Sequence, residues 1–144
     1  MIEEALLLLF SFMILLYLSW IILYFLPERK HQGEAVYPPV SIILPAHNEE
    51  EVIGDAVKYS LNTFYPNEKE VIVVNDGSTD GTGEIVREFM EKDDRVRLIE
   101  IEHSGKANAI NTALTKARGE IVVVVDADSK LSGNALIELV KPFK

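Results

Sequence analysis

Four short runs of β-branched and aliphatic residues punctuate the polar part of the chain. They cover residues 40–44, 70–74, 96–101 and 121–125, and turn-forming residues bound each of them. This is the pattern of β-strands. The last run is apolar without interruption, which favours a strand in the centre of a sheet.

Segments with helical periodicity follow each predicted strand. Their apolar residues recur at spacings of three and four, as on one face of an amphipathic helix. The predicted helices cover 49–61, 82–90, 106–117 and a segment from near Asn134 to the end of the chain. Strict alternation of strand and helix predicts an α/β fold with a mainly parallel sheet and helices on both faces.

An uncharged apolar run, residues 5–26, precedes this pattern. A helix rises about 1.5 Å per residue, so a run of this length spans the ~30 Å hydrocarbon layer of a bilayer. We therefore predict one transmembrane helix, with residues 1–4 as a short extracytoplasmic tail. A cleaved signal peptide would begin with basic residues, and a buried core helix would show a polar face.

Basic residues stand on only one side of this run. Arg29, Lys30 and His31 follow it, whereas only acidic residues precede it. The positive-inside rule therefore predicts a single-pass protein of the cell membrane with its soluble domain in the cytoplasm. Residues 27–39 are expected to form a juxtamembrane linker, and residues 40–144 the soluble domain.

Composition limits the ligands of that domain. The formal net charge is −9 and the basic residues are scattered, which disfavours nucleic acid as a partner. The sequence has no cysteine, which excludes disulfides and thiolate metal sites. A metal would be held by oxygen or imidazole ligands, and it could join an acidic site to an anionic ligand.

Ligands of parallel sheets bind beyond the carboxyl ends of the strands, so the segments after the strands are the candidates for chemistry. In the first, 45–51, Asn48 is interpreted as a helix cap and His47 as a packed or solvated side chain, because nothing in the sequence pairs with it. In the second, 75–82, Asp76 can accept hydrogen bonds from a ligand ring or hydroxyl, and glycines allow the backbone to approach that ligand.

The next two segments add one cation and two carboxylates. Gly105 and Lys106 open a predicted helix, where a backbone N–H and an ammonium can meet a phosphate. Asp126 and Asp128 follow the last strand and suit a divalent cation. Each motif alone is also explained by helix caps and turns. Together, at one sheet edge, they fit a nucleoside diphosphate.

The segments Pro45–Glu49, Asn75–Asp80, Gly105–Asn111 and Asp126–Asp128 resemble, in order and spacing, the motifs of the family 2 glycosyltransferases. The resemblance covers the chain from residue 40 onward and is strongest to the processive synthases of chitin, cellulose, hyaluronan and poly-N-acetylglucosamine. It implies a GT-A fold, as in nucleotide-diphospho-sugar transferases. It also implies an inverting reaction, in which an acceptor hydroxyl displaces the nucleoside diphosphate in one step.

The same resemblance implies roles for individual residues and partners. Ala46, Glu49 and Asp76 would line a uridine pocket, Lys106 would face the nucleotide or its diphosphate, and Asp126 and Asp128 would hold ribose and metal. The implied metal is Mg²⁺ or Mn²⁺, and the implied partners are a UDP-sugar, the lipid bilayer and a polysaccharide or lipid acceptor.

Similar enzymes continue with further strands, an acidic catalytic base and often a Gln-x-x-Arg-Trp motif, none of which is found in this sequence. No catalytic residue is therefore identified, and the domain is expected to be incomplete at its carboxyl end. Two hypotheses stay open. The chain is the donor-binding part of a glycosyltransferase that a second polypeptide completes, or a nucleotide-sugar-binding or assembly fragment without catalysis. A receiver-like signalling domain is disfavoured, because the acidic segments come in a different order.

Overall fold

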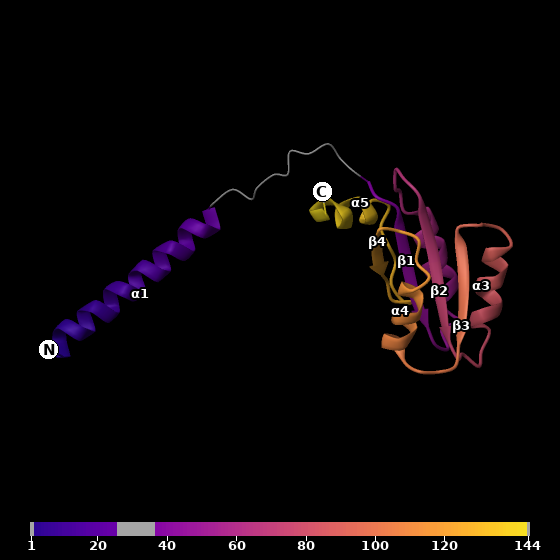
Figure 1. Ribbon diagram of the computed structural model, residues 1–144, viewed down its shortest axis with the longest axis horizontal. Helices are drawn as coiled ribbons and strands as arrows, with labels where there is room; N and C mark the ends of the chain where they lie inside the picture. The colour runs from indigo at the N-terminus through magenta and orange to yellow at the C-terminus, as the bar shows by residue number, and fades with distance from the viewer. Residues whose placement is uncertain (1, 26–36, 144) are drawn as a thin grey trace. The chain divides into compact units, whose positions relative to one another are not determined.

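The computed structural model describes residues 2–25 and 37–143, which belong to two separate compact units (Figure 1). The first contains helix α1, Ile2–Phe25, which by length and composition is able to cross a membrane. It contains the predicted span of residues 5–26 apart from Leu26, which lies outside the described residues, and it begins earlier, at Ile2, within the predicted tail. Arg29, Lys30 and His31, on which the predicted orientation rests, also lie outside the described residues.

The second unit alternates strands and helices as predicted. Its elements are β1 (Val40–Ala46), α2 (Ile53–Asn62), β2 (Lys69–Asp76), α3 (Thr82–Met90), β3 (Val96–Ile101), α4 (Lys106–Leu114), β4 (Ile121–Val124), α5 (Ala135–Val140) and the 3₁₀ turn η1 (Lys141–Phe143). The four strands are all parallel, in the order β3-β2-β1-β4. The predicted parallel α/β architecture is confirmed.

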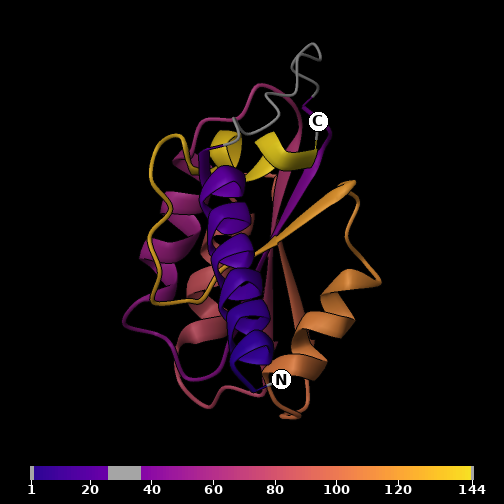
Figure 2. The same cartoon turned by 90° about the vertical axis from the view of Figure 1, so that its left-hand side faces the viewer.

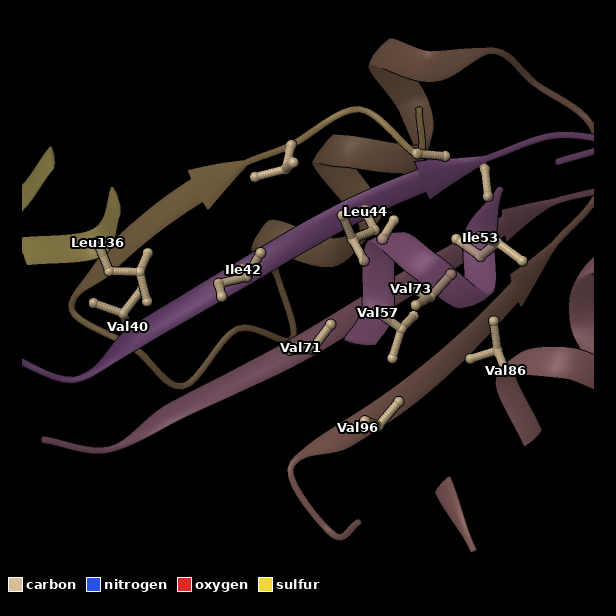
Figure 3. Close-up of a cluster of buried hydrophobic side chains, with 14 of the residues drawn as sticks. Val40, Ile42, Leu44, Ile53, Val57, Val71, Val73, Val86, Val96 and Leu136 are labelled. Carbon is tan, nitrogen blue, oxygen red and sulfur yellow. The ribbon is translucent and has the colours of Figure 1, made fainter. Parts of the chain in front are cut away.

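Helices cover both faces of the sheet, because successive side chains of a strand point to opposite faces. Ile42 and Leu44 of β1 lie in a core with Val57 of α2 and Leu136 of α5 (Figure 3). Between them, Ile43 faces the other way and belongs to a second core with α4. Figure 2 shows α4 on one side of the sheet and α2 and α3 on the other. This packing leaves the strand ends free for the loops.

Strand β4 corrects one prediction. It was expected in the centre of the sheet, but it pairs with β1 alone and lies at an edge of the described sheet. Val124 is 43% exposed. An uninterrupted apolar run is typical of a strand that is covered on both faces, but it carries no information about neighbours on both sides. The central strands are β1 and β2.

The helix boundaries differ from prediction at three places. Helix α2 begins at Ile53 rather than at residue 49, because 49–52 form a turn. Helix α4 ends at Leu114 instead of 117, and α5 gives way to η1 at Lys141. None of these shifts moves a strand end, so the loops of interest stay at the same edge.

Candidate functional site

A pocket of about 310 Å³ lies at the carboxyl ends of the strands. Its lining includes every residue predicted to bind substrate or metal: Ala46, Glu49, Asp76, Lys106, Asp126 and Asp128. The other lining residues are Pro45, His47, His103, Gly105, Ala109 and Ala127. Parallel register explains the convergence, because β2, β1 and β4 end side by side. The roles of these residues remain predictions, and their proximity is what the structure provides.

The loops after β1 and β2 are joined by hydrogen bonds between side chains and backbone. Asn48 is central to this: its Oδ1 accepts from the Thr79 N–H at 2.8 Å, and its own N–H donates to Ser78 Oγ at 3.0 Å. The Glu49 N–H donates to Thr82 Oγ1 at 2.9 Å. Asn48 has a φ of 55°, a left-handed conformation that asparagine tolerates better than most residues. Its predicted role as cap of α2 is therefore wrong.

Asp76 is a buried carboxylate at the end of β2, and it is 3% exposed. Its Oδ1 accepts from the Ser104 N–H at 2.8 Å and its Oδ2 from the Gly105 N–H at 2.9 Å. Burial alone would raise the pKa of Asp76, but these hydrogen bonds and the His103 ring outweigh it and lower that pKa. Asp76 therefore stays ionised and fixes the loop after β3 against the end of β2.

Two glycines of the pocket loops have positive φ. Gly77 has φ 64°, and a Cβ on it would lie 2.7 Å from the backbone N of His103. Gly77 was expected to let the backbone approach a ligand. In the structure it lets two loops of the protein approach each other. Gly105 has φ 89° and open space around its Cβ position, so only its conformation requires glycine there.

Lys106 and Asp126 pair with each other across the pocket. The Lys106 ammonium donates to Asp126 Oδ1. Both side chains are more than half exposed, at 57% and 54%. Exposed ion pairs contribute about 0–1 kcal/mol, so this pair can open at little cost.

Asp128 is the aspartate of the pocket that the protein holds most weakly. Its only hydrogen bond to the described residues comes from Ser129 Oγ, at 3.4 Å. Ala127, between the two aspartates, is buried, and this holds the Asp126–Asp128 segment in place. Exposed oxygen ligands suit Mg²⁺ or Mn²⁺, which take few protein carboxylates and complete their shell with phosphate and water. The residues present therefore fit such an ion.

A histidine pair was missed in the sequence. His47 and His103 stack with ring centroids 4.1 Å apart and planes 31° apart. Their Nδ1 atoms lie 2.6 and 3.1 Å from the backbone oxygen of Asp76. His47 is exposed, in line with its interpretation as a solvated side chain, but its contact with His103 was not predicted. The pairing depends on β2 lying between β1 and β3, and no local sequence pattern carries that order.

A second pocket, of about 400 Å³, lies at the opposite end of the sheet, where the strands begin. Glu70 is its central carboxylate, and it accepts from Ser41 Oγ at 2.6 Å, the Arg118 N–H at 2.7 Å and Arg97 Nη1 at 2.8 Å. Lys69 donates to three carbonyl groups at the end of α2. The partly buried charges here bond to the protein itself, so the larger pocket is the weaker candidate for a site.

Two curated relatives show what the chain is similar to. It is 41% identical over 108 residues to "Probable glycosyltransferase YdaM" of Bacillus subtilis, which covers 72% of this chain and 26% of that protein. It is 38% identical over 106 residues to a poly-β-1,6-N-acetyl-D-glucosamine synthase of Staphylococcus epidermidis, which covers 73% and 25%. The chain thus spans about a quarter of the length of these relatives.

Solved structures share both fold and sequence with the chain. The mannosyltransferase PcManGT of Pyrobaculum calidifontis, in complex with GDP-Man and Mn²⁺, has a TM-score of 0.73 and 34% identity, over 89% of this chain and 39% of that one. S. aureus TarS in complex with UDP-GlcNAc has a TM-score of 0.65 and 31% identity, over 71% and 30%. The family model "Glycosyl transferase family 2" matches residues 41–144. This chain therefore belongs to glycosyl transferase family 2.

Proposed function

We propose that this chain is the donor-binding part of a membrane-anchored, inverting glycosyltransferase that uses a UDP-sugar. One observation carries the proposal: Asp76, Lys106, Asp126 and Asp128, which come from three separate segments of the chain, line a single pocket at the carboxyl edge of the sheet. Nucleotides bind at this edge in open parallel sheets. Similarity to a mannosyltransferase bound to GDP-Man and to TarS bound to UDP-GlcNAc supports it.

Each end of the pocket suits one part of the donor. We assign the base to the side of Ala46, Glu49 and Asp76, where an ionised, rigidly held carboxylate can accept a hydrogen bond from a ring N–H. A uracil ring offers one such N–H. Lys106 opens α4, so its ammonium and the helix amino terminus both favour the diphosphate. Asp126 is assigned to the ribose and the metal, and Asp128 to the metal.

A bound metal ion would offset the repulsion between the acidic pocket and a diphosphate. The pocket is lined by Glu49, Asp76, Asp126 and Asp128 against a single lysine, which would repel a diphosphate. We propose that Mg²⁺ or Mn²⁺ bridges the aspartates to the diphosphate and stabilises the charge of the leaving group. The Mn²⁺ in the PcManGT complex supports a divalent ion.

Helix α1 is proposed to anchor the site to the cell membrane by a single span, with the pocket in the cytoplasm. Its length and composition support the span, and the basic residues after it support the orientation. The acceptor is proposed to be a growing polysaccharide or a lipid. A polysaccharide synthase and a β-monoglucosyldiacylglycerol synthase are both among the similar proteins.

Transfer itself is proposed only for the complete catalytic unit. The chain spans about a quarter of its relatives, and we assign the general base to no described residue. The proposal therefore includes a second polypeptide or segment that supplies this base. The competing hypothesis is that the chain only binds nucleotide sugar or an assembly partner. Transfer assays distinguish the two hypotheses, whereas donor-binding assays do not.

A calorimetric titration of the detergent-solubilised chain with UDP, with and without Mn²⁺, tests donor binding. Binding that requires Mn²⁺ is expected, with GDP weaker than UDP. The Asp128→Ala variant should bind at least about tenfold more weakly, which is about 1.4 kcal/mol. Equal binding of UDP with and without Mn²⁺, or by the variant, would contradict the proposal.

A further inference from the structure

We propose that His47, Asp76 and His103 form a second metal site, distinct from Asp126 and Asp128, that binds a borderline divalent cation of the Zn²⁺ class. One potential ligand atom from each of the three residues lies within 4.8 Å of the other two. Two imidazoles and one carboxylate are a ligand set that zinc uses with a fourth position left open.

Asp76 is the rigid part of the proposed site. The Ser104 and Gly105 N–H groups hold its two oxygens, yet a carboxylate has about four lone-pair positions. The spare position on Oδ2 faces His103, whose Nδ1 lies 3.1 Å away. Because Asp76 cannot move without breaking these bonds, it supplies a fixed negative ligand on which a cation can settle.

The two histidines bring their ring nitrogens to the same place. Their Nδ1 atoms lie 2.6 and 3.1 Å from the Asp76 carbonyl oxygen, and a carbonyl only accepts, so both nitrogens carry protons in this state. Zinc–ligand bonds of about 2.1 Å in a tetrahedron place the ligand atoms about 3.4 Å apart. His103 Nδ1 and Asp76 Oδ2 are 3.1 Å apart, close to this spacing, and no two potential ligand atoms are more than 4.8 Å apart. These separations therefore change by at most about 1.4 Å. Each ring proton moves to Nε2, which for His47 breaks the 3.3 Å contact with Asn48 Nδ2.

The rings have the freedom to make this change. They stack at 4.1 Å, and they must tilt apart for both lone pairs to point at one ion. The His103 side chain is 60% exposed and His47 is also exposed, so a rotation about the side-chain bonds displaces little packing. The rigid carboxylate and the exposed imidazoles together make a site that can close around the ion.

Ligand chemistry separates this site from the aspartate pair. Imidazole nitrogens select zinc, copper and nickel, whereas carboxylates with water select magnesium and manganese. Asp76 lies on the side of the pocket assigned above to the nucleotide base. An ion at His47 and His103 would therefore obstruct that base, a consequence that rests on the proposed function, whereas the metal site itself does not.

The direct test uses no nucleotide. The full chain in detergent is titrated with Zn²⁺ by calorimetry and with Co²⁺ by visible absorption, which reports tetrahedral nitrogen and oxygen coordination. One tight equivalent is expected. His103→Asn and His47→Asn should each weaken it by about tenfold or more, since even the loss of an outer hydrogen-bond partner costs 10–100-fold. Two control variants, Asp128→Asn in the aspartate pair and His31→Asn at the remaining histidine, should leave zinc binding unchanged.

Two results would overturn the site. Zinc binding that survives in the His47→Asn/His103→Asn double variant but is lost in Asp128→Asn would place the ion on the aspartate pair. No zinc binding by a sample that circular dichroism shows to be folded would reject it outright. If zinc binds as proposed but UDP never binds, the second metal site stands and the proposed function fails. If zinc and UDP both bind and do not compete, the proposed overlap between the zinc site and the nucleotide-base site is wrong.

Discussion

The two ends of the sheet carry similar side chains and use them differently. Where the strands begin, the partly buried charges bond to each other or to the backbone, as Glu70 does with Arg97. The side chains there that make no hydrogen bond or ion pair within the described residues have both signs: Glu68, Asp94 and Arg118. Where the strands end, the carboxylates that lack a cationic partner among the described residues are Glu49 and Asp128, and no basic side chain balances them.

This difference in charge pairing distinguishes a structural pocket from a candidate binding site better than the pocket volume does. The pocket at the strand beginnings is the larger of the two, at about 400 against 310 Å³. Removal of one partner of a paired, partly buried charge leaves the other uncompensated and destabilises the fold. An exposed group of charges of one sign is instead available to a ligand of the other sign. Removing charges at the two ends should therefore affect stability at one end and binding at the other.

The largest effect on stability is expected for Glu70→Ala. The change leaves Arg97, which is 27% exposed, without its carboxylate and removes the acceptor of Ser41 and Arg118. Loss of one partner of a buried pair costs about 3–5 kcal/mol, and partial exposure reduces this to about 2–3 kcal/mol. Chemical denaturation followed by circular dichroism measures it. A change below about 0.5 kcal/mol would mean that this end is not held by its internal pairs.

The next effect is expected at the glycines of the pocket loops. Gly77→Ala forces a positive φ on alanine and places its Cβ against the His103 backbone, so we expect a loss of about 2–3 kcal/mol. Gly105→Ala has the same strain but open space, and it should cost about 1 kcal/mol. The two variants are compared in one denaturation series. Equal losses would show that the approach of the two loops does not constrain Gly77.

A smaller effect is expected from pH through Asp76. Its pKa is lowered in the folded protein, so its ionisation stabilises the fold above the unfolded value of about 3.9, and this contribution is lost as the pH falls through the lower, folded pKa. Unfolding free energies of the wild type and Asp76→Asn should therefore differ most near neutral pH and converge below about pH 4. A difference that grows with acid would contradict the assigned hydrogen bonds.

The sequence predicted what local patterns encode. Runs such as Val71–Val74 revealed the strands, and their alternation with helices revealed the parallel sheet, which in turn placed Asp76, Lys106, Asp126 and Asp128 at one edge. Contacts that depend on strand order could not be predicted. The pairing of His47 with His103, and the bond of Asn48 to the neighbouring loop, arise only because β1 and β3 flank β2.

Residue types with several uses were also misread. Asparagine before a helix is usually a cap, yet Asn48 adopts a left-handed conformation and bonds across to Thr79. Glycine in a loop can serve a ligand or a turn, and Gly77 serves the approach of His103. The apolar run of β4 was predicted to be a central strand. Its composition indicates that both faces of the strand are covered, but it does not indicate how many neighbouring strands pair with it.

The most direct test of the difference between the two ends compares two exposed aspartates. Asp128 lines the pocket where the strands end, and Asp94 lines the one where they begin. Removing either should change the unfolding free energy by no more than about 0.5 kcal/mol. The variants Asp128→Ala and Asp94→Ala are compared with the wild type by Mn²⁺ electron paramagnetic resonance in the presence of UDP. We predict that the free Mn²⁺ signal falls with the wild type and with Asp94→Ala but not with Asp128→Ala. An equal fall in all three samples would contradict the proposed metal site at Asp128.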